Sequence, residues 1–600
     1  MSLKRSFRST HIRLFVILLI CCTGLLAFQL PVSVIAERQQ TQLPISPVVL
    51  QTAEEIQHGT DAGLQATDPR PGTVRVNSQG EIGVEVRITG TPAAAAAAFA
   101  AAGIRVGTWS EPYPLVSVWV QPEQLDTLAA LPMVMYVGPM LMPIVRSGTV
   151  VTKGDTILGA AQARTEFGLS GKGIRIGVIS DGVEGLDIGQ AAGELPPDCP
   201  ENLTDLTPSC VLVDADNAGF RNEGRAMLEI IHDLAPDAIL GFSSGINGVT
   251  GFVDAINFLE EDFVADIIVD DIGYLTEPYF ENGTIGTRAQ KAVDAGVVFV
   301  SAAGNDAENH YQAPLNIPDN CPPNVERGCL HRFAANDTSL SFSLPQAVRI
   351  QVILQWDNPF SNTTTAARNA LDNLDLYLVE GNSVLASSDT IQSIMGVPLE
   401  MLTYQNASGT TQQVDVVIDA PALNSGTTPQ IEMLLYAFSG NRRIDLTYEH
   451  TTAADSIYGH PGMSGVIGVG AVDVDAQPPI QIQSYSSQGP VTIRGESTPR
   501  SKPDIVATDC VATSTPRFST FCGTSAAAPH VAALVALLLE EEPDVPPWRI
   551  RSLLKRRAVD LGPAGFDPVF GAGRANVVSS INESRFGPQI FHLMLPLIQR

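Results

Sequence analysis

A serine that follows glycine and threonine is the residue in this sequence best suited to nucleophilic chemistry. Its segment reads Phe521-Cys-Gly-Thr-Ser-Ala-Ala-Ala-Pro-His-Val-Ala-Ala533. The apolar run from Ser525 to Glu540 predicts a helix that begins at Ser525, with Pro529 in its first turns, where a missing N–H does little harm. A serine there gains the positive end of the helix dipole and can donate its own N–H to a developing oxyanion. Taken alone, the segment would be explained more simply by a serine N-cap.

Two other polar residues stand directly after predicted strands. Asn305 follows the apolar run Val297–Ser301, and Asp181 follows the run Ile174–Ser180. Parallel sheets place their sites beyond the carboxyl ends of the strands, so both residues are candidates for a site with Ser525. An amide donor such as that of Asn305 stabilises the oxyanion of acyl transfer by roughly 3–4 kcal/mol.

The elements that must position these residues alternate between strand and helix. We predict strands at 173–180, 238–242, 267–269, 297–301 and 466–472, and helices at 225–234, 253–260, 288–295 and 525–540. This alternation predicts an α/β fold with a parallel sheet and helices on both faces. Between residues 330 and 450 the pattern becomes alternating apolar and polar, which predicts an antiparallel β-sandwich inserted into the α/β domain.

The ordered set of motifs resembles the subtilase family. The resemblance rests on the strand ending in Asp181, on Ala302-Ala-Gly-Asn305 and on the Gly-Thr-Ser block, with support from segments 469–473, 485–490 and 502–506. Together the motifs span about 173–310 and 455–577. The resemblance implies a subtilisin-like serine endopeptidase that cleaves protein or peptide substrates, with Ser525 as nucleophile and Asn305 as oxyanion donor.

One departure from the subtilase pattern is large, because the block that carries the family's histidine base is missing. Glu223 stands at the corresponding place, twelve residues before the Ala235 that opens an Ala-Pro-Asp-Ala turn. This resembles the sedolisins, acid-active relatives with a glutamate base at that spacing. Sedolisins add an aspartate one helical turn later, where this chain has Met227, so Asp181 is the expected partner of Glu223.

A glutamate base predicts activity in acid. Its carboxyl group must be ionised to accept a proton, and its ordinary pKa is about 4.3. Beside Asp181 the pair would share a proton, which raises one apparent pKa. His232 is the competing base, but it lies nine residues beyond Glu223, on the opposite side of a regular helix.

Substrate contacts are expected from two further segments that resemble subtilase sequences. Asp270-Asp271-Ile-Gly273 follows a strand at the place where subtilases pair with extended substrate. His460 lies in the segment that resembles the floor of the primary specificity pocket, although a loop histidine without a role is an equal alternative.

The flanking regions suggest a zymogen. An α+β pattern at 73–140 resembles a subtilase propeptide, with a cut expected between about 140 and 155, and the preceding polar residues read as a linker. The sandwich resembles β-domains attached to many subtilases. Its Asp372 and Asp375 could bind structural calcium, but capping of a strand is the simpler explanation. The reaction itself requires no cofactor or metal.

The N-terminus is typical of an export signal. Basic residues precede an apolar run from Leu14 to Phe28, too short for a typical membrane span, although an uncleaved anchor is an alternative. After its removal six cysteines remain, which allow fifteen pairings. We favour disulfides between close neighbours in this secreted chain: Cys199 with Cys210, Cys321 with Cys329, and Cys510 with Cys522.

Composition limits the remaining choices. The 600 residues carry a formal charge of −28, which argues against nucleic-acid binding. Nothing in the sequence indicates an oligomeric state. The rival to an enzyme is an inactive subtilase-like scaffold or binding protein, which the missing histidine favours. The predicted order is signal peptide (1–36), linker and propeptide (37–150), peptidase domain (151–329), sandwich (330–450), peptidase domain (451–577) and tail (578–600).

Overall fold

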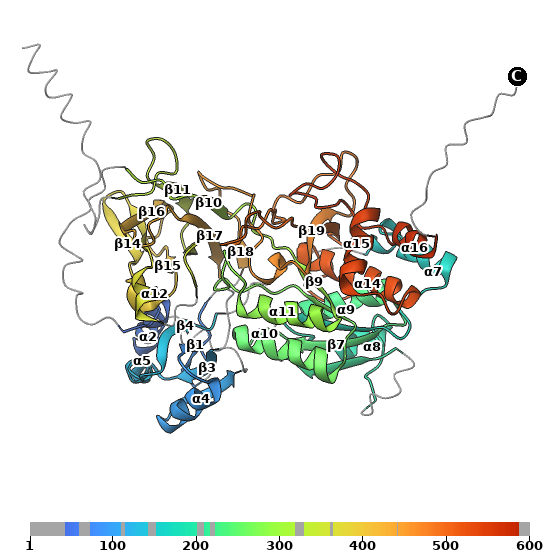
Figure 1. Ribbon diagram of the computed structural model, residues 1–600, viewed down its shortest axis with the longest axis horizontal. Helices are drawn as coiled ribbons and strands as arrows, with labels where there is room; N and C mark the ends of the chain where they lie inside the picture. Colours follow the sequence, from blue (N-terminus) through green and yellow to red (C-terminus); the bar gives the residue numbers. More distant parts are fainter. Residues whose placement is uncertain are drawn as a thin grey trace, which may run out of the picture.

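Three units lie side by side in the computed structural model: an α/β unit, a β-sandwich and a small N-terminal α+β unit (Figure 1). The structure describes residues 43–58, 73–77, 79–109, 114–141, 152–200, 209–216, 222–318, 329–360, 364–440 and 442–586. The predicted signal peptide and most of the expected cleavage region lie outside these residues.

The α/β unit is built on a seven-stranded sheet in the order β20-β19-β9-β8-β5-β7-β6. Every neighbouring pair in this sheet is parallel. Its strands are short and rich in Val and Ile, as expected for a sheet covered on both faces. The predicted α/β class is therefore confirmed. The strands are β5 (Arg175–Ser180), β6 (Val211–Ala215), β7 (Ile239–Ser244), β8 (Ile267–Asp270), β9 (Val298–Ala302), β19 (Ile467–Asp473) and β20 (Ile505–Asp509).

Helices cover the two faces of this sheet with different residues of the same strands. On β5, Ile176 and Val178 belong to a core shared with α9 (Glu223–Leu234) and α14 (Thr524–Glu541). Ile179 belongs to a second core, formed with α10 (Gly248–Asn257) and α11 (Thr284–Ala295). Shorter or peripheral helices are α6 (Gly154–Ile157), α7 (Ala160–Phe167), α8 (Leu186–Ala192), α15 (Pro547–Arg557) and α16 (Val577–Phe586).

The inserted unit is a sandwich of two antiparallel sheets, in the orders β10-β17-β12-β15 and β11-β16-β13-β14, with β18 paired to β17. Its first strand lies upstream of residue 330, because β10 pairs with β17 across the sheet. One apolar core, which includes Trp356, fills the space between the sheets. The elements are β10 (His310–Pro314), β11 (Leu340–Leu344), β12 (Val348–Trp356), α12 (Thr365–Asn369), β13 (Asn373–Glu380), β14 (Ser383–Ser388), α13 (Gln392–Met395), β15 (Leu399–Gln405), β16 (Gln412–Ala422), β17 (Gln430–Ser439) and β18 (Arg442–Ile444).

The N-terminal unit is a four-stranded antiparallel sheet in the order β2-β3-β1-β4, with α2 and α4 beside it. It does not have a core of its own. Its apolar side chains form one cluster with residues of the sandwich such as Phe360 and Leu399. The elements are α2 (Pro47–Gln57), β1 (Ile82–Ile88), α4 (Pro92–Ala101), β2 (Arg105–Trp109), β3 (Leu115–Val120), α5 (Leu125–Ala129) and β4 (Val134–Pro139).

Polar contacts join this unit to the start of α10. The carboxylate of Glu85 accepts the N–H of Val249 at 2.6 Å. The guanidinium of Arg75 donates to Asn247 at 2.7 Å. A carboxylate at a helix N-terminus satisfies a backbone donor that otherwise has no partner in the helix. The N-terminal unit thus contacts both of the other units.

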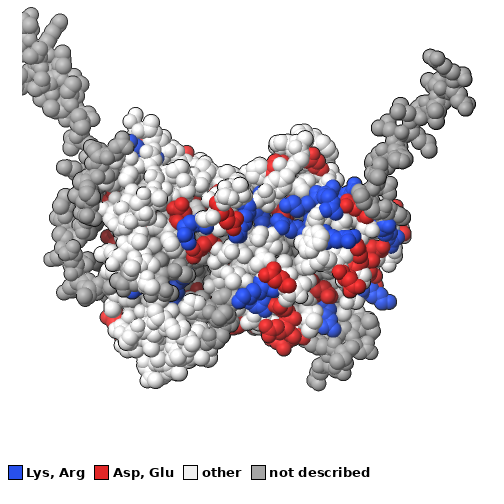
Figure 2. Space-filling model, in the orientation of Figure 1, with Lys and Arg blue, Asp and Glu red and all other residues white. Residues whose placement is uncertain are grey.

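Charged side chains are unevenly spread over the face in Figure 2, where they gather on the α/β half and are sparse on the other. Basic residues of α15 lie next to acidic ones there. Arg551 and Lys555 both contact Asp504, and Arg556 contacts Glu583. Among the helices of the described ranges, none is long and apolar enough to cross a membrane.

Truncation inside α14 should show how much the α/β core depends on it. Leu534 is fully buried in this helix. We expect Leu534→Ala to lower the free energy of unfolding by about 2–5 kcal/mol, because it leaves a cavity. Urea unfolding followed by circular dichroism measures the change. Leu50→Ala, at a site that is 38% exposed, is the control. Equal losses in both variants would contradict this account.

Candidate active site

The turn before Ser525 presents the serine at the start of α14. Ser525 is the second residue of the helix, as the motif predicts, and it is fully buried. Gly523 precedes the helix with φ +101°, a conformation that favours glycine. Within the described residues, the Ser525 hydroxyl has no hydrogen-bond partner. The serine therefore combines a helix N-terminus with a hydroxyl that is not engaged in a structural contact.

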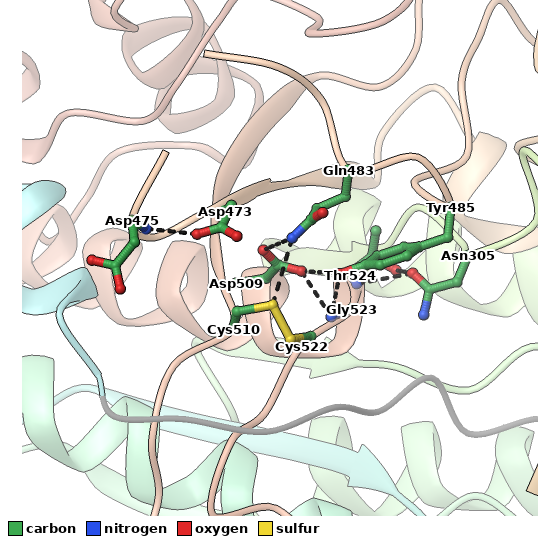
Figure 3. The surroundings of a disulfide bond; sticks show 10 residues. All are labelled: Asn305, Asp473, Asp475, Gln483, Tyr485, Asp509, Cys510, Cys522, Gly523 and Thr524. Carbon is green, nitrogen blue, oxygen red and sulfur yellow. Dashed lines mark hydrogen bonds between the residues drawn. A yellow bond between two sulfur atoms is a disulfide. The ribbon is translucent and has the colours of Figure 1, made fainter. Parts of the chain in front are cut away.

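Three interactions hold this turn in place (Figure 3). The N–H of Gly523 donates to Asp509, the last residue of β20, at 2.9 Å. Tyr485 donates its hydroxyl to the same carboxylate. A disulfide joins Cys510 to Cys522, directly before Gly523. The turn is thus tied to the end of a sheet strand through both its backbone and a covalent bond.

Asn305 lies beside this turn with its amide orientation fixed. Its Oδ1 accepts hydrogen bonds from the N–H and the hydroxyl of Thr524, each at 3.0 Å. The amide nitrogen consequently points away from Thr524, as Figure 3 shows. An amide whose oxygen is already engaged presents its N–H groups as donors, which is what an oxyanion requires.

The sandwich helps to hold Asn305. Arg443 of β18 donates to the backbone oxygen of Asn305 at 2.8 Å. The same guanidinium forms an ion pair with the buried Asp306 at 3.3 Å. Tyr436 of β17 donates its hydroxyl to Asp306 at 2.9 Å. These contacts link the inserted unit to the residue that follows the proposed oxyanion donor.

Asp181 and Glu223 meet where β5 ends and α9 begins. Oδ1 of Asp181 accepts the backbone N–H of Glu223 at 2.9 Å. Glu223 is the first residue of α9 and is fully buried, while Asp181 is 2% exposed. This hydrogen bond joins the Asp181 carboxylate to the backbone of Glu223. Asp181 therefore caps the start of α9, and the pairing of its carboxylate with that of Glu223 stays a prediction.

Asp271 lies in the same acidic cluster, one residue beyond β8. It is fully buried, and within the described residues neither of its carboxyl oxygens has a hydrogen-bond partner. Burial and the nearby Asp181 raise the pKa of Asp271 to about 8. Asp271 thus lies near Asp181, and its predicted contact with substrate stays a prediction.

Asp270 points to a different neighbour, His460. Nε2 of His460 lies 2.9 Å from Asp270, and Nδ1 lies 3.0 Å from Glu277. Burial alone lowers the pKa of His460, but Glu277 and Asp270 raise it to about 10 overall. Both ring nitrogens thus face carboxylates of the protein. A direct contact of His460 or Gly273 with substrate stays a prediction.

His232, the competing base, lies near the far end of α9. It is half-buried, and burial lowers its pKa against a smaller opposing effect of Asp237. The same helix begins at Glu223, which lies in the acidic cluster. The helix therefore places Glu223, and not His232, next to Asp181.

Two of the predicted disulfides are confirmed, Cys199–Cys210 and Cys510–Cys522. Cys329 is also disulfide-bonded, whereas Cys321 lies outside the described residues. Both oxygens of Asp372 accept hydrogen bonds, from Asn358 and from Ser425. Those bonds favour the capping role of Asp372 over calcium binding.

Sequence reasoning missed the position of Asp271 and the contact between Asp306 and the sandwich. The sequence did contain a signal for the position of Asp271, since two adjacent aspartates follow a buried strand. Consecutive strand residues point to opposite sides, so only one of Asp270 and Asp271 can face the site. The contacts of Asp306 join residues more than a hundred positions apart, and no local pattern marks them.

The buried His460 predicts a pH-dependent stability. A histidine whose pKa is raised from 6.5 to about 10 stabilises the fold fully below pH 6.5, and this contribution is lost as pH rises through about 10. We expect His460→Gln to remove that part of the alkaline loss in the free energy of unfolding. Urea titrations across this range measure it, with His310→Gln as the buried-histidine control. An unchanged pH dependence in His460→Gln would refute the assignment.

Comparisons with known proteins find matches to parts of this chain. Residues 362–573 match the model of the Subtilase family; this segment includes Ser525 but begins after Asp181, Glu223 and Asn305. An extracellular serine protease of Serratia marcescens is 41% identical over 76 residues, 13% of this chain and 7% of that protein. Fervidolysin of Fervidobacterium pennivorans is 28% identical over 158 residues, 23% of this chain and 22% of the relative.

A further relative and two solved structures also match the chain. The minor extracellular protease Epr of Bacillus subtilis (strain 168) is 36% identical over 69 residues, 12% of this chain and 11% of the relative. The chain thus spans less than a quarter of each of these relatives. Among solved structures, the Clostridium perfringens CspB protease gives a TM-score of 0.43 at 13% identity, covering 72% of this chain and 99% of that one. Fervidolysin gives 0.41 at 14% identity, covering 86% and 63%.

The described residues form the α/β fold with added antiparallel sheets that the subtilase resemblance implies, and residues 362–573 carry the match to that family.

Proposed function

We propose that this protein is a serine-type endopeptidase in which Ser525 is the nucleophile and Glu223 the general base. The observation that carries the proposal is that two packed helices, α9 and α14, both begin beyond the carboxyl-terminal edge of the parallel sheet. α9 and α14 pack against each other, and each begins after a parallel strand. Glu223 and Ser525 stand in the first turns of these helices, at the edge where such sheets place their sites.

The residues support a complete acyl-transfer reaction. The Ser525 oxygen attacks the carbonyl carbon of the scissile peptide bond and passes its proton to Glu223. The amide of Asn305 and the N–H of Ser525 donate to the oxyanion that forms. Glu223 then returns the proton to the leaving amine, and water hydrolyses the acyl-enzyme by the same route. These steps use side chains and backbone groups of the protein and no cofactor.

A carboxylate base should work in acid. Glutamate accepts a proton only when it is ionised, and its ordinary pKa of about 4.3 makes it a weaker base than imidazole at neutral pH. Asp181 accepts a hydrogen bond from the backbone N–H of Glu223, and this bond fixes the start of α9. We therefore propose an acidic pH optimum, as in the sedolisins that Glu223 resembles.

The N-terminal unit supports synthesis as a zymogen. It docks on α10 through Glu85 and shares an apolar cluster with the sandwich. Ser525 is fully buried in this arrangement. We propose that residues 37–150 act as a propeptide that the chain itself removes. The relatives from Serratia and Bacillus are named extracellular, which supports secretion of this chain after removal of an N-terminal signal.

The alternative is an inactive scaffold that binds proteins through the sandwich. The absence of a histidine at the position of Glu223 favours it. The acidic cluster around Glu223 favours the enzyme, because a scaffold gains nothing from three buried carboxylates that must be desolvated.

Incubation of the purified full chain at several pH values between about 3 and 8 tests the base and the nucleophile together. We expect release of an N-terminal fragment, fastest at acid pH, and its loss in Ser525→Ala and Glu223→Gln. His232→Ala should cleave like the wild type. Gel electrophoresis and mass spectrometry of the fragments measure the outcome. Full activity of Glu223→Gln together with loss in His232→Ala would overturn the assignment of the base, and a rate maximum above pH 8 would exclude the acidic optimum.

Asn305 gives a separate test of the oxyanion site. We expect Asn305→Leu to lower kcat on a peptide substrate about 10²–10³-fold with little change in KM, because the lost donor acts only on the developing charge. Steady-state kinetics measure both constants. Thr524→Val is the matched variant, since it removes one hydrogen bond to the Asn305 oxygen and leaves the donor in place. A larger loss in Thr524→Val than in Asn305→Leu would contradict this role.

A further inference from the structure

The turn before Ser525 is closed by a disulfide that joins the neighbours of two hydrogen-bonded residues. Cys510 directly follows Asp509 at the end of β20. Its partner Cys522 directly precedes Gly523, whose N–H donates to Asp509 at 2.9 Å (Figure 3). We propose that this disulfide is a redox switch, because its reduction releases the turn that positions Ser525 and reversibly stops catalysis. The inference rests on the proposed function, in which Ser525 is the nucleophile.

Asp509 is the anchor of this turn. It is fully buried, and its Oδ2 accepts the N–H of Gly523 and the hydroxyl of Tyr485. Its Oδ1 accepts the side-chain amide of Gln483 at 2.9 Å. A buried carboxylate needs such donors, so these bonds fix the place of Asp509 at the end of its strand. We call Asp509, Tyr485, Gln483 and the disulfide the Gly523 clamp.

The disulfide restrains a residue whose backbone conformation is unfavourable. Cys510 has a φ of +54°, in the left-handed region that costs free energy for residues other than glycine. Next to it, Val511 and Phe521 exchange backbone hydrogen bonds at 3.0 and 2.7 Å, which keep the two arms of the loop together. Once the S–S bond is broken, Cys510 can relax, and the contact between the strand end and the turn loses its covalent support.

The remaining contacts make this release local. α14 is buried from Thr524 to Leu539, and Thr524 donates to Asn305 at 3.0 Å. Neither the apolar packing nor this hydrogen bond depends on the disulfide. Reduction should therefore displace the turn by a small distance and leave the helix folded. A misplacement of about 1 Å is enough to slow catalysis strongly, because the reacting atoms must be aligned.

A small reductant can reach this disulfide, since both of its cysteines are half-buried. A dithiol reduces it in two exchange steps. One thiolate of the dithiol attacks a sulfur of the disulfide, which forms a mixed disulfide and frees the other cysteine as a thiolate. The second thiol of the dithiol then displaces the remaining cysteine and closes a cyclic disulfide. The two freed cysteines take up the two protons that the dithiol loses, and the dithiol supplies the two electrons.

Such a switch confines activity to an oxidising compartment. Cysteines are kept reduced in a typical cytoplasm, and disulfides form after export. For the secreted chain proposed above, the Gly523 clamp is then completed only outside the cytoplasm. The chain is thus unable to cleave proteins in the cell that makes it.

The disulfide Cys199–Cys210 is the matched control. Its cysteines are 11 residues apart in the sequence, and those of Cys510–Cys522 are 12 apart. Cys210 directly precedes β6 at one edge of the seven-stranded sheet, whereas Cys510 directly follows β20 at the other edge. A reductant acts on both disulfides, so variants that lack one pair at a time show which of them matters.

Steady-state kinetics on a peptide substrate, with and without dithiothreitol, test the switch. In the wild type we expect the reductant to lower kcat about 10–100-fold with little change in KM. The kcat should recover when the reductant is removed and the disulfide forms again in air. Cys510→Ser/Cys522→Ser should have the low kcat without reductant and show no further fall with it. Cys199→Ser/Cys210→Ser should keep both the wild-type kcat and its fall.

Hydrogen exchange followed by mass spectrometry provides a readout that does not need activity. In Ser525→Ala we expect dithiothreitol to speed exchange in the peptide that covers residues 511–525 and to leave the peptide of β8 unchanged. Ser525→Ala/Cys510→Ser/Cys522→Ser should show the fast exchange without reductant. Circular dichroism should be the same in the oxidised and reduced protein, because the helix stays folded.

The outcomes separate the two proposals. An unchanged kcat in the reduced wild type overturns the switch, and so does a loss that reoxidation fails to restore. A further fall with reductant in Cys510→Ser/Cys522→Ser also overturns it, because another disulfide is then responsible. Unchanged exchange at 511–525 overturns the release of the turn whatever the activity. Faster exchange in a chain that cleaves no peptide in either state supports the release of the turn and overturns the proposed function instead.

Discussion

The burial of α14 in the centre of the α/β unit is the constraint on which the candidate site depends. The helix is buried from Thr524 to Leu539, so its position relative to the sheet cannot vary without opening the core. Its N-terminus is also attached to the ends of two strands, through Asp509 of β20 and through Asn305 after β9. Because apolar packing and polar contacts specify the same position, Ser525 is held precisely although its own hydroxyl makes no structural bond.

The inserted sandwich extends that constraint beyond the α/β unit. Arg443 and Tyr436 bind Asp306 next to Asn305, and these contacts satisfy a buried carboxylate that would otherwise be costly. The N-terminal unit packs against the same sandwich in one apolar cluster. Movement of the sandwich would therefore disturb both the oxyanion donor and the apolar surface on which the N-terminal unit packs. The three units are coupled through ordinary packing and a few buried polar groups.

The sequence was sufficient for the parts of the fold that local patterns encode. Short Val- and Ile-rich runs predicted the parallel strands, and the helical pattern at 225–234 predicted α9 to within two residues of its start. Ser525 and Asn305 followed from motifs at strand and helix ends. The burial of Asp271 near Asp181 did not follow, because it depends on which of Asp270 and Asp271 faces inward, and strand register is a tertiary property. The early start of the sandwich at β10 was missed for a similar reason, since its pairing partner β17 lies more than a hundred residues away.

A carboxylate base brings an electrostatic problem that a histidine base does not. A pair of an aspartate and a neutral histidine carries one negative charge, whereas a pair of an aspartate and a glutamate carries two. Asp181 and Glu223 are both almost fully buried. Desolvation and mutual repulsion then favour protonation of the base itself, which would make it useless as a proton acceptor. An acidic optimum is the consequence that we propose, because the charge of such a site depends on pH.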